Sequence, residues 1–386
     1  MSGRAHGGAG AAKGAGRRPL VVKIGTSTLA TAEGRIDRDY LGKIAEQVKR
    51  VRDAGWNPII VTSAAITSGL EALGIRERPR DIPSLQAAAS VGQGVLTSAY
   101  AEALAPYGIV TSLVLLTRRD TADRTAYLHA RDTFDRLLDM GVVPIVNEND
   151  TVSVEQIRFG DNDTLAALVA CLVEAELVVI LSDIDGLFDA NPRKVPDARL
   201  IEHVDAIGSD ILAAAGDAGT AMGSGGMITK IKAARVLMVA GIPLVVCNGN
   251  RADVVVDAAG GKPVGTLFSA SERPHEITPK KLWIALGDAT RGALRVDDGA
   301  KAALIERGSS LLAVGVVNVE GCFDAGDIVD ILDAAGHVFA RGRVSADSDE
   351  VELAEGLDQK TLAGNRLLAH LAERPLVHRD ELVVFE

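Results

Sequence analysis

The chain has 386 residues, of which 47% are hydrophobic and 24% are charged, and this composition is typical of a globular protein with two or three domains. Aromatic residues contribute only 3%, so the core must consist mainly of Val, Ile, Leu and Ala, which suits buried parallel strands covered by helices. A net charge of −11 excludes attraction to nucleic acid or to an anionic membrane surface through bulk charge.

The cysteines and the N-terminal residues bear on where the protein works. Cys171, Cys247 and Cys322 lie far apart and form no CxxC or Cys/His metal-binding pattern, which indicates small core residues in a reducing compartment, the cytoplasm. No apolar run reaches the about 20 residues that cross a membrane. Residues 1–18 are rich in Gly, Ala and basic residues and lack the apolar centre of a signal peptide, so we expect a flexible tail outside the fold.

Strands and helices alternate from Leu20 onward. In chain order, the hydrophobic pattern predicts a strand and turn at 20–25, a helix at 37–54, strands at 58–62 and 109–116, a helix at 124–140, a strand at 142–146, a helix at 164–174, a strand at 177–181, a helix at 227–240 and a strand at 243–247. This alternation predicts a mostly parallel sheet covered on both faces, with ligands bound beyond the carboxyl ends of its strands.

The pattern changes near residue 280. Short β-rich segments separated by Gly and Asp follow, and they predict strands at 293–296, 314–319, 327–332 and 337–343. We interpret this region as a small β-barrel-like domain whose boundary with the first domain lies between about 270 and 290.

Two segments combine glycine with lysine. The first predicted strand ends in Lys23-Ile-Gly-Thr-Ser27, and a lysine in a buried strand is costly unless an anion meets it. Alternatively, its ammonium group reaches solvent at the strand end. Far downstream, Gly223-Ser-Gly-Gly-Met-Ile-Thr-Lys230 opens a helix, where backbone amides favour a phosphate. This run lacks the order of a P-loop, and an ordinary flexible loop remains the alternative.

Polar residues are densest between these two segments. Asn147-Glu-Asn-Asp150 closes a predicted strand, and Gly160-Asp-Asn-Asp163 opens a predicted helix, with Asp161 or Asn162 as a possible N-cap. Capping explains one residue but not the whole cluster, whose amides and carboxylates suit a zwitterionic substrate. Ser182 to Phe188 follows another buried strand and suits a nucleotide pocket, with Asp183 or Asp185 as a metal ligand left as an alternative.

These motifs, in this order, resemble the amino-acid kinase superfamily and, within it, the glutamate 5-kinase family. The resemblance covers about Leu20 to Arg379, and it rests on these segments: Val21–Ser27, Leu115–Arg118, Ala130–Thr133, Val146–Asp150, Gly160–Asp163, Gly223–Lys230 and Gly265–Phe268. The C-terminal segments Gly299–Ala300, Arg307–Leu312, Gly326–Asp327 and Ala340–Gly342 resemble a PUA domain, which accompanies many bacterial members of that family.

The resemblance implies a domain plan and an activity. It implies a three-layer α/β/α kinase domain at 19–275, a PUA domain at 289–368 and a C-terminal extension at 369–386 after the tail at 1–18. It also implies transfer of a phosphoryl group from ATP, with Mg²⁺, to the side-chain carboxylate of L-glutamate, the first step of proline biosynthesis. Further implications are inhibition by proline, a homo-oligomer (dimer or tetramer) and functional coupling to a glutamyl phosphate reductase.

Residue roles follow from the same resemblance. Lys23 and Lys230 would contact the transferring phosphoryl group, and Asp163 would position both lysines. The residues implied to bind glutamate are Ser63, Asp150 and Asn162. Those implied to bind ATP are Lys23, Ser182, Asp183, Ser224, Gly225, Gly226, Met227, Ile228, Thr229 and Lys230. No residue is assigned to a metal.

The chain departs from the family at one position near the substrate. The family usually has Ser-Gly-Ala after the second strand, where this chain has Ser63-Ala64-Ala65. If the backbone there needs a positive φ, alanine adds strain, and we expect altered affinity rather than loss of the fold.

Two alternative functions remain open. One is a kinase of the same superfamily that acts on another small acid, a nucleotide or a carbamate. The other is an RNA-binding regulatory protein that acts through the PUA domain, but residues 289–386 contain 10 Lys and Arg against 18 Asp and Glu, which opposes phosphate binding.

Overall fold

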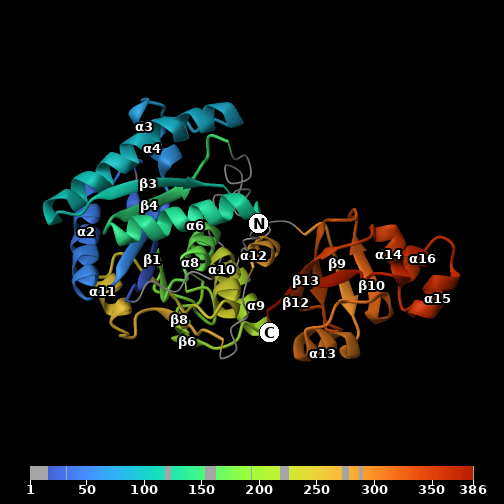
Figure 1. Ribbon diagram of the computed structural model, residues 1–386. Helices are drawn as coiled ribbons and strands as arrows, with labels where there is room; N and C mark the ends of the chain where they lie inside the picture. The colour runs from blue at the N-terminus through green and yellow to red at the C-terminus, as the bar shows by residue number, and fades with distance from the viewer. Residues whose placement is uncertain are drawn as a thin grey trace, which may run out of the picture.

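The computed structural model describes residues 16–31, 33–117, 123–152, 162–192, 194–217, 226–271, 278–286 and 290–385. It consists of a large α/β domain and a smaller β-rich domain that lie side by side (Figure 1). Among the described residues, no helix combines the length and apolar character needed to cross a membrane.

The large domain is built on an eight-stranded sheet with the order β3-β4-β2-β1-β5-β7-β8-β6. In that order the strands are Thr111–Leu116, Val143–Glu148, Asn57–Val61, Pro19–Ile24, Leu177–Ser182, Leu244–Asn248, Thr266–Phe268 and His203–Val204. Neighbouring strands are parallel except β7 and β8, which are antiparallel. The predicted mostly parallel sheet is therefore confirmed.

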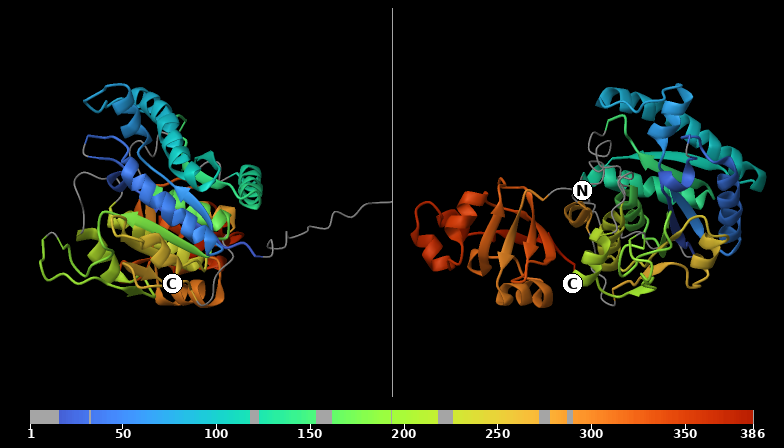
Figure 2. Two further views of the ribbon diagram at one scale, coloured as in Figure 1. Left: turned by 90° about the vertical axis from the view of Figure 1, so that its left-hand side faces the viewer. Right: turned by 180° about the vertical axis from the view of Figure 1, so that it is seen from behind.

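Helices cover both faces of this sheet, as the alternating sequence pattern predicts (Figure 2). One face carries α2 (Arg38–Asp53), α4 (Ile82–Leu104) and α11 (Val254–Ala259). The other carries α6 (Arg124–Asp139), α8 (Asn162–Leu172), α9 (Ser209–Asp217), α10 (Met227–Val239) and α12 (Pro279–Leu286).

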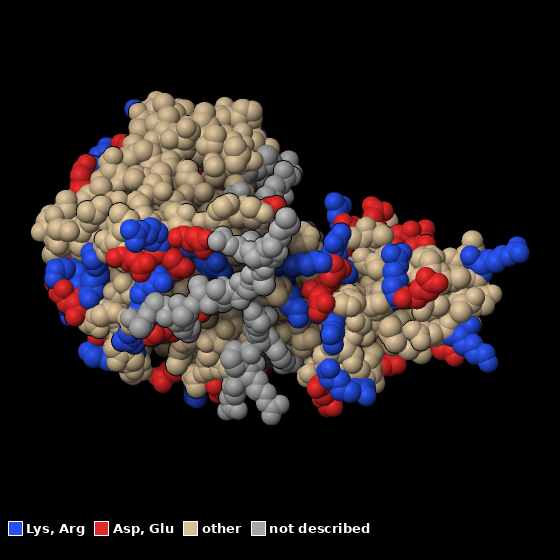
Figure 3. Space-filling view, viewed as in Figure 1, with Lys and Arg blue, Asp and Glu red and all other residues tan. Residues whose placement is uncertain are grey.

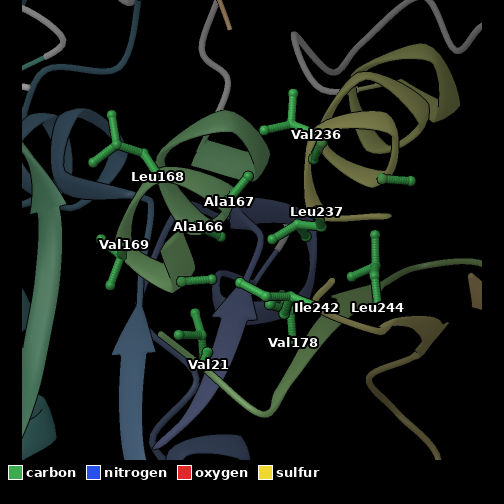
Figure 4. Packing of buried hydrophobic residues seen from close by; sticks show 14 of the residues in the cluster. Val21, Ala166, Ala167, Leu168, Val169, Val178, Val236, Leu237, Ile242 and Leu244 are labelled. Atoms are coloured by element: carbon green, nitrogen blue, oxygen red, sulfur yellow. The ribbon is translucent and has the colours of Figure 1, made fainter. Parts of the chain in front are cut away.

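Alternating side chains of β1 belong to the two cores. Leu20 and Val22 pack under α2, whereas Val21 points to the opposite face. There Val21 and Val178 meet the small and apolar side chains of α8 and α10 (Figure 4). Because α8 and α10 begin near the carboxyl ends of the strands, this packing fixes the first turns of both helices beside those ends.

A helical pair that the sequence pattern did not predict stands at the upper edge of the domain (Figure 1). It consists of α3 (Ala65–Ala72) and α4, and the short elements α1 (Thr26–Leu29) and η1 (Ala105–Tyr107) complete the domain. The two helices touch backbone to backbone: a Cβ added at Gly92 would lie 1.8 Å from the Ala65 carbonyl oxygen, and one at Gly69 would lie 1.7 Å from that of Ala88.

The smaller domain contains a five-stranded sheet with the order β10-β9-β11-β12-β13. In that order the strands are Val316–Gly321, Gly292–Val296, Ile328–Leu332, Val338–Val344 and Val377–Val384. All pairs are antiparallel except β9 and β11. The remaining elements are α13 (Asp298–Arg307), η2 (Ala313–Gly315), α14 (Ser348–Ala354), α15 (Gln359–Gly364) and α16 (Ala369–Ala372). The expected separate β domain is confirmed, and β13 comes from the expected C-terminal extension.

The domains share an interface in which α12 packs against β12 and β13, and α10 contributes Arg235. Arg235 of α10 donates a hydrogen bond to the Val338 carbonyl, and its guanidinium lies 4.5 Å from the centre of the Phe385 ring. Val383 of β13 packs within the apolar core on the α10 side of the large sheet. The two domains are thus joined by buried side-chain contacts in addition to the covalent link between them.

The N-terminal residues that the structure describes also contact the fold. Arg17 pairs with Asp135 of α6 at 2.8 Å, and Arg18 stacks 3.9 Å above the centre of the Trp56 ring. Residues 1–15 of the expected tail lie outside the described residues. Its last two residues, Arg17 and Arg18, contact the large domain instead of extending away from it.

Candidate active site

The candidate site lies where the carboxyl ends of β1, β2, β4 and β5 meet the first turns of α8 and α10. Lys23 is the penultimate residue of β1, Asp163 is the second residue of α8, and Lys230 lies in the first turn of α10. Segments that are far apart in sequence therefore meet at one edge of the sheet, as the parallel topology predicts.

Asp163 is the centre of this site. Its side chain is fully buried, and its two oxygens pair with different lysines: Lys23 Nζ lies 2.8 Å from Oδ1, and Lys230 Nζ lies 3.1 Å from Oδ2. Burial by itself would raise the pKa of Asp163, but the two ammonium groups and hydrogen bonds from Lys23 and Thr229 hold that pKa well below its usual range. The carboxylate is therefore ionised at neutral pH.

The first turn of α10 surrounds Lys230 with further polar groups. The Thr229 hydroxyl donates to Asp163 Oδ2 at 2.7 Å, and Gly226 precedes the helix as its N-cap. Met227 is buried, whereas the Ile228 side chain is 40% exposed. Of the predicted ATP-binding residues, Ser224 and Gly225 lie outside the described residues.

A second group of side chains forms a hydrogen-bonded amide cluster beside β2. Asn162 Nδ2 donates to the Ser63 hydroxyl oxygen at 2.9 Å, to Asn147 Oδ1 at 2.9 Å and to the Thr62 carbonyl. Asn147 Nδ2 in turn donates to Oε1 of Gln93 at 2.8 Å. Ser63 and Asn162, both predicted to bind the substrate, are thus in direct contact.

Asp150 follows this cluster at the end of the β4 segment and is partly buried. Burial raises the pKa of Asp150 to about 6, and the positive charge of Arg78 partly opposes this shift. The ionised carboxylate of Asp150 can pair with the ammonium group of an amino acid. This ion pair is strongest when water is excluded from the site.

Ser182 and Asp183 lie one strand away from Lys23. β5 pairs directly with β1, with Leu181 opposite Ile24, so Ser182 follows immediately beyond the end of β1. The Ser182 hydroxyl donates to Asp183 Oδ1 at 3.3 Å, and Asp183 is exposed. Within the described parts of the chain, no group of three or more His, Cys, Asp or Glu side chains is placed to bind a metal ion.

Ala64, which stands where the family usually has glycine, adopts a backbone conformation with a positive φ. Ala64 has φ of 76° and ψ of 11°, in the left-handed region, and it is the N-cap of α3. An alanine in this region carries strain of about 1–2 kcal/mol that a glycine would not. The chain therefore stores strain immediately beside the Ser63 hydroxyl.

Two side chains near the site were not singled out from the sequence. Gln93 lies on α4, for which no element was predicted, and Arg78 lies in the exposed segment between α3 and α4. The signal that would have pointed to Gln93 is a polar amide between two glycines, Gly92 and Gly94, within a helix of mostly small and apolar residues.

Taken together, the site brings two ammonium groups, a helix N-terminus and an amide cluster close to one another. The ammonium groups suit the oxygens of a transferring phosphoryl group, and the cluster with Asp150 suits a small molecule that carries both carboxylate and ammonium groups. These features define a phosphotransferase that acts on a small polar acceptor.

Comparisons with known proteins agree with this class. The profile of the Amino acid kinase family matches residues 18–248, and that of the PUA domain matches residues 292–362. The chain therefore belongs to the amino acid kinase family.

Within this family, the chain is similar over nearly its full length to glutamate 5-kinases. It is 44% identical over 367 residues to glutamate 5-kinase of Caldanaerobacter subterraneus subsp. tengcongensis, covering 95% of this chain and 98% of the relative. It is 45% identical over 370 residues to glutamate 5-kinase of Streptomyces coelicolor, covering 95% and 96%. Among solved structures, carbamate kinase from Giardia lamblia bound to AMP-PNP matches 66% of this chain and 99% of its own, with 18% identity and a TM-score of 0.49.

Proposed function

We propose that this protein transfers the γ-phosphoryl group of ATP to the side-chain carboxylate of L-glutamate, which yields ADP and L-glutamyl 5-phosphate, the first step of proline biosynthesis. The observation that carries the proposal is the buried Asp163 carboxylate between Lys23 and Lys230. The full-length similarity to glutamate 5-kinases supports glutamate as the acceptor.

The reaction needs in-line positioning of two anions. An oxygen of the substrate carboxylate attacks the γ-phosphorus while the bond from that phosphorus to the β–γ bridging oxygen breaks, and ADP leaves with the bond's electrons. A carboxylate nucleophile is already ionised at neutral pH, so no general base is required and none is assigned.

Lys23 and Lys230 are proposed to contact the transferring group. Their ammonium groups approach from β1 and α10, and charge spread over the phosphoryl oxygens in the transition state is stabilised between them. Asp163 pairs with both lysines before the reaction begins, so their positions need little reorganisation when charge develops. Asp163 thus acts through preorganisation rather than through proton transfer.

The proposed binding residues fall on two sides of this centre. Ser63, Asn162 and Asp150 lie on the β2 and β4 side and are proposed to bind glutamate, with the Asp150 carboxylate facing its ammonium group. The proposed ATP residues lie on the β5 and α10 side: Lys23, Ser182, Asp183 and the segment from Ser224 to Lys230. With these roles, the acceptor and the donor would lie on opposite sides of the Lys23 and Lys230 ammonium groups.

Mg²⁺ is proposed to enter bound to the phosphates of ATP. Mg²⁺ favours phosphate oxygens and water, whereas both oxygens of Asp163 are paired with lysines. When bound, it would neutralise phosphate charge, and the two lysines would share that task from the protein side.

Regulation and assembly follow the same family expectations. We propose inhibition by proline at the glutamate site, a cytoplasmic location, functional coupling to a glutamyl phosphate reductase that consumes the reactive acyl phosphate, and a homo-oligomer. The surface over α3 and α4 is largely free of charged side chains (Figure 3), and Val91 of α4 and Leu73 at the end of α3 are exposed, which supports contact with a second copy.

A substrate panel tests the proposal. Purified protein with ATP and Mg²⁺ is incubated with glutamate, aspartate, N-acetylglutamate, carbamate or UMP, and ADP release is measured with and without proline. We expect ADP release with glutamate alone among these acceptors. A clear preference for another acceptor would contradict the assignment of glutamate, and ADP release with none of them would contradict the proposed activity.

A further inference from the structure

Gln93 is a buried polar side chain that the proposed roles leave unexplained. It lies in the middle of α4 and is 8% exposed. Its Oε1 accepts a hydrogen bond from Asn147, but within the part of the chain that the structure describes its Nε2 has no hydrogen-bond partner. A buried donor without a partner costs about 1–3 kcal/mol, so an apolar residue would favour stability at this position.

The oxygen of Gln93 determines how the neighbouring amides face. A side-chain amide has a donating end and an accepting end, and it offers one only by turning the other away. Because Asn147 donates to Gln93, its Oδ1 faces Asn162 and accepts from Nδ2 at 2.9 Å. The NH₂ group of Asn162 is therefore turned toward Asn147, and it also donates to the Ser63 hydroxyl oxygen and to the Thr62 carbonyl. The Gln93 acceptor on α4 and the Thr62 backbone carbonyl thus together fix the orientation of two consecutive amides, those of Asn147 and Asn162.

The backbone around Gln93 is fixed against the same loop that carries Ser63. Gly92, its neighbour, packs against the Ala65 carbonyl so closely that an added Cβ would lie 1.8 Å away. Ala65 opens α3 directly after Ser63 and Ala64. Gln93 and Ser63 therefore keep a constant separation, and the amide cluster between them has little freedom to rearrange.

We propose that Gln93 is a positioning residue that orients Asn147 and Asn162 for binding of the amino-acid substrate. The inference rests on the proposed function, in which Ser63 and Asn162 bind glutamate. Gln93 acts through the two asparagines and does not touch the phosphoryl group, so its loss weakens binding of the acceptor in the ground state and in the transition state alike. That pattern raises KM for glutamate and leaves kcat and KM for ATP nearly unchanged.

The test compares two substitutions at Gln93 with a control on the same helix. Gln93→Met keeps the length but removes the acceptor, and we expect KM for glutamate to rise about tenfold. Gln93→Glu keeps an acceptor for Asn147, and we expect KM to stay within about threefold of wild type. Thr97→Val removes a hydroxyl that donates within the helix to the Gln93 carbonyl, and it should leave KM unchanged.

The outcomes separate this inference from the proposed function. Wild-type protein that does not phosphorylate glutamate contradicts the proposed function itself. An active wild type together with an unchanged glutamate KM in Gln93→Met, or a loss confined to kcat, overturns the role of Gln93. If Gln93→Met does not fold, Gln93→Asn withdraws the acceptor by one methylene group and is judged by the same criterion.

Discussion

At the scale of single residues, the two lysines around Asp163 make equivalent contacts. Both are buried, and each takes one carboxylate oxygen. Their pairing with Asp163 was expected from the family resemblance, and it agrees with the place of each residue at the end of a predicted strand or near the start of a predicted helix. Gln93 and Arg78 could not be found in this way, because their relevance depends on the packing of α3 and α4, for which no pattern was recognised.

Replacing Lys230 tests its proposed contact with the phosphoryl group. Lys230→Met keeps the length of the side chain but removes the ammonium group, and we expect turnover to fall on the order of 10³-fold because transition-state charge loses a partner. Lys232→Met, on the exposed side of the same helix, is the matched control and should keep wild-type turnover. Circular dichroism checks that both variants fold. Near-normal turnover in a folded Lys230→Met would contradict the role of Lys230.

Replacing Ala64 tests the strain beside Ser63. At φ of 76° a glycine avoids the steric penalty of the alanine methyl group, so Ala64→Gly should raise the free energy of unfolding by up to about 1 kcal/mol. Ala89→Gly in the interior of α4 should instead lower it by about 1 kcal/mol, because glycine is unfavourable within a helix. Denaturant titration measures both. An equal loss of stability in the two variants would show that Ala64 is not strained.

The raised pKa of Asp150 makes a prediction with a definite sign. The unfolded carboxyl has a pKa of about 4, whereas burial gives about 6 in the folded protein. The folded state therefore keeps a proton that the unfolded state loses, and Asp150 lowers stability progressively as pH rises from about 4 to 6. Asp150→Asn should then melt at a higher temperature than wild type at pH 8, and this advantage should shrink at pH 5.

Activity should show the complementary dependence on pH. Below about pH 6 the neutral Asp150 no longer attracts the ammonium group of the substrate, so KM for glutamate should rise in the wild type. Asp150→Asn should have a high KM at every pH. Arg78→Gln removes the charge that lowers the pKa, so the rise in KM should begin at a higher pH. A melting difference that does not change with pH would contradict this account.

At the scale of elements, the parallel strands and the helices that follow them were predictable, because buried strands are continuous apolar runs and the helices have one apolar face. The predicted helix at 227–240 is α10 at Met227–Val239, and the predicted strand at 177–181 is β5 at Leu177–Ser182. The pair α3 and α4 was not predicted. Its helices meet through glycine and alanine, so a contact between backbones replaces the large apolar side chains that periodicity detects.

This close contact predicts a sharp contrast between two glycines of α4. Gly92→Ala places a methyl group against the Ala65 carbonyl, and we expect a loss of about 2–3 kcal/mol in stability together with a higher KM for glutamate. Gly94→Ala meets nothing within 4 Å and should gain about 0.5–1 kcal/mol. Thermal melts and kinetics measure both effects. If Gly92→Ala is as stable as Gly94→Ala, the helices are not in backbone contact.

At the scale of the whole molecule, the change from long α/β units to short β segments located the two domains, but not the way they meet. β13 is the last strand in the chain, and it returns to the smaller sheet as the neighbour of β12. Its end contributes Val383 to the core of the large domain and Phe385 to the Arg235 contact. Such long-range pairing has no local signal, because neither a hydrophobic period nor a turn motif specifies a partner in another domain.

The interface predicts that the two domains stabilise one another through α10. Arg235 lies on the helix whose first turn carries Lys230, so losing its bond to the Val338 carbonyl and its stacking on Phe385 should loosen α10 and the β12–β13 edge together. We expect Arg235→Met to lower the free energy of unfolding by about 1–3 kcal/mol, since a hydrogen bond from a charged group is lost.

Hydrogen exchange distinguishes this coupling from a local effect. In Arg235→Met, backbone amides of α10 and of β12 and β13 should exchange faster than in the wild type, because opening of one side exposes the other. Leu367→Ser is the control: this side chain is 75% exposed between α15 and α16, at the end of the smaller domain far from α10 (Figure 1), and its replacement should leave α10 unchanged. Faster exchange confined to one domain in Arg235→Met would mean that the contact holds the domains together without coupling their stabilities.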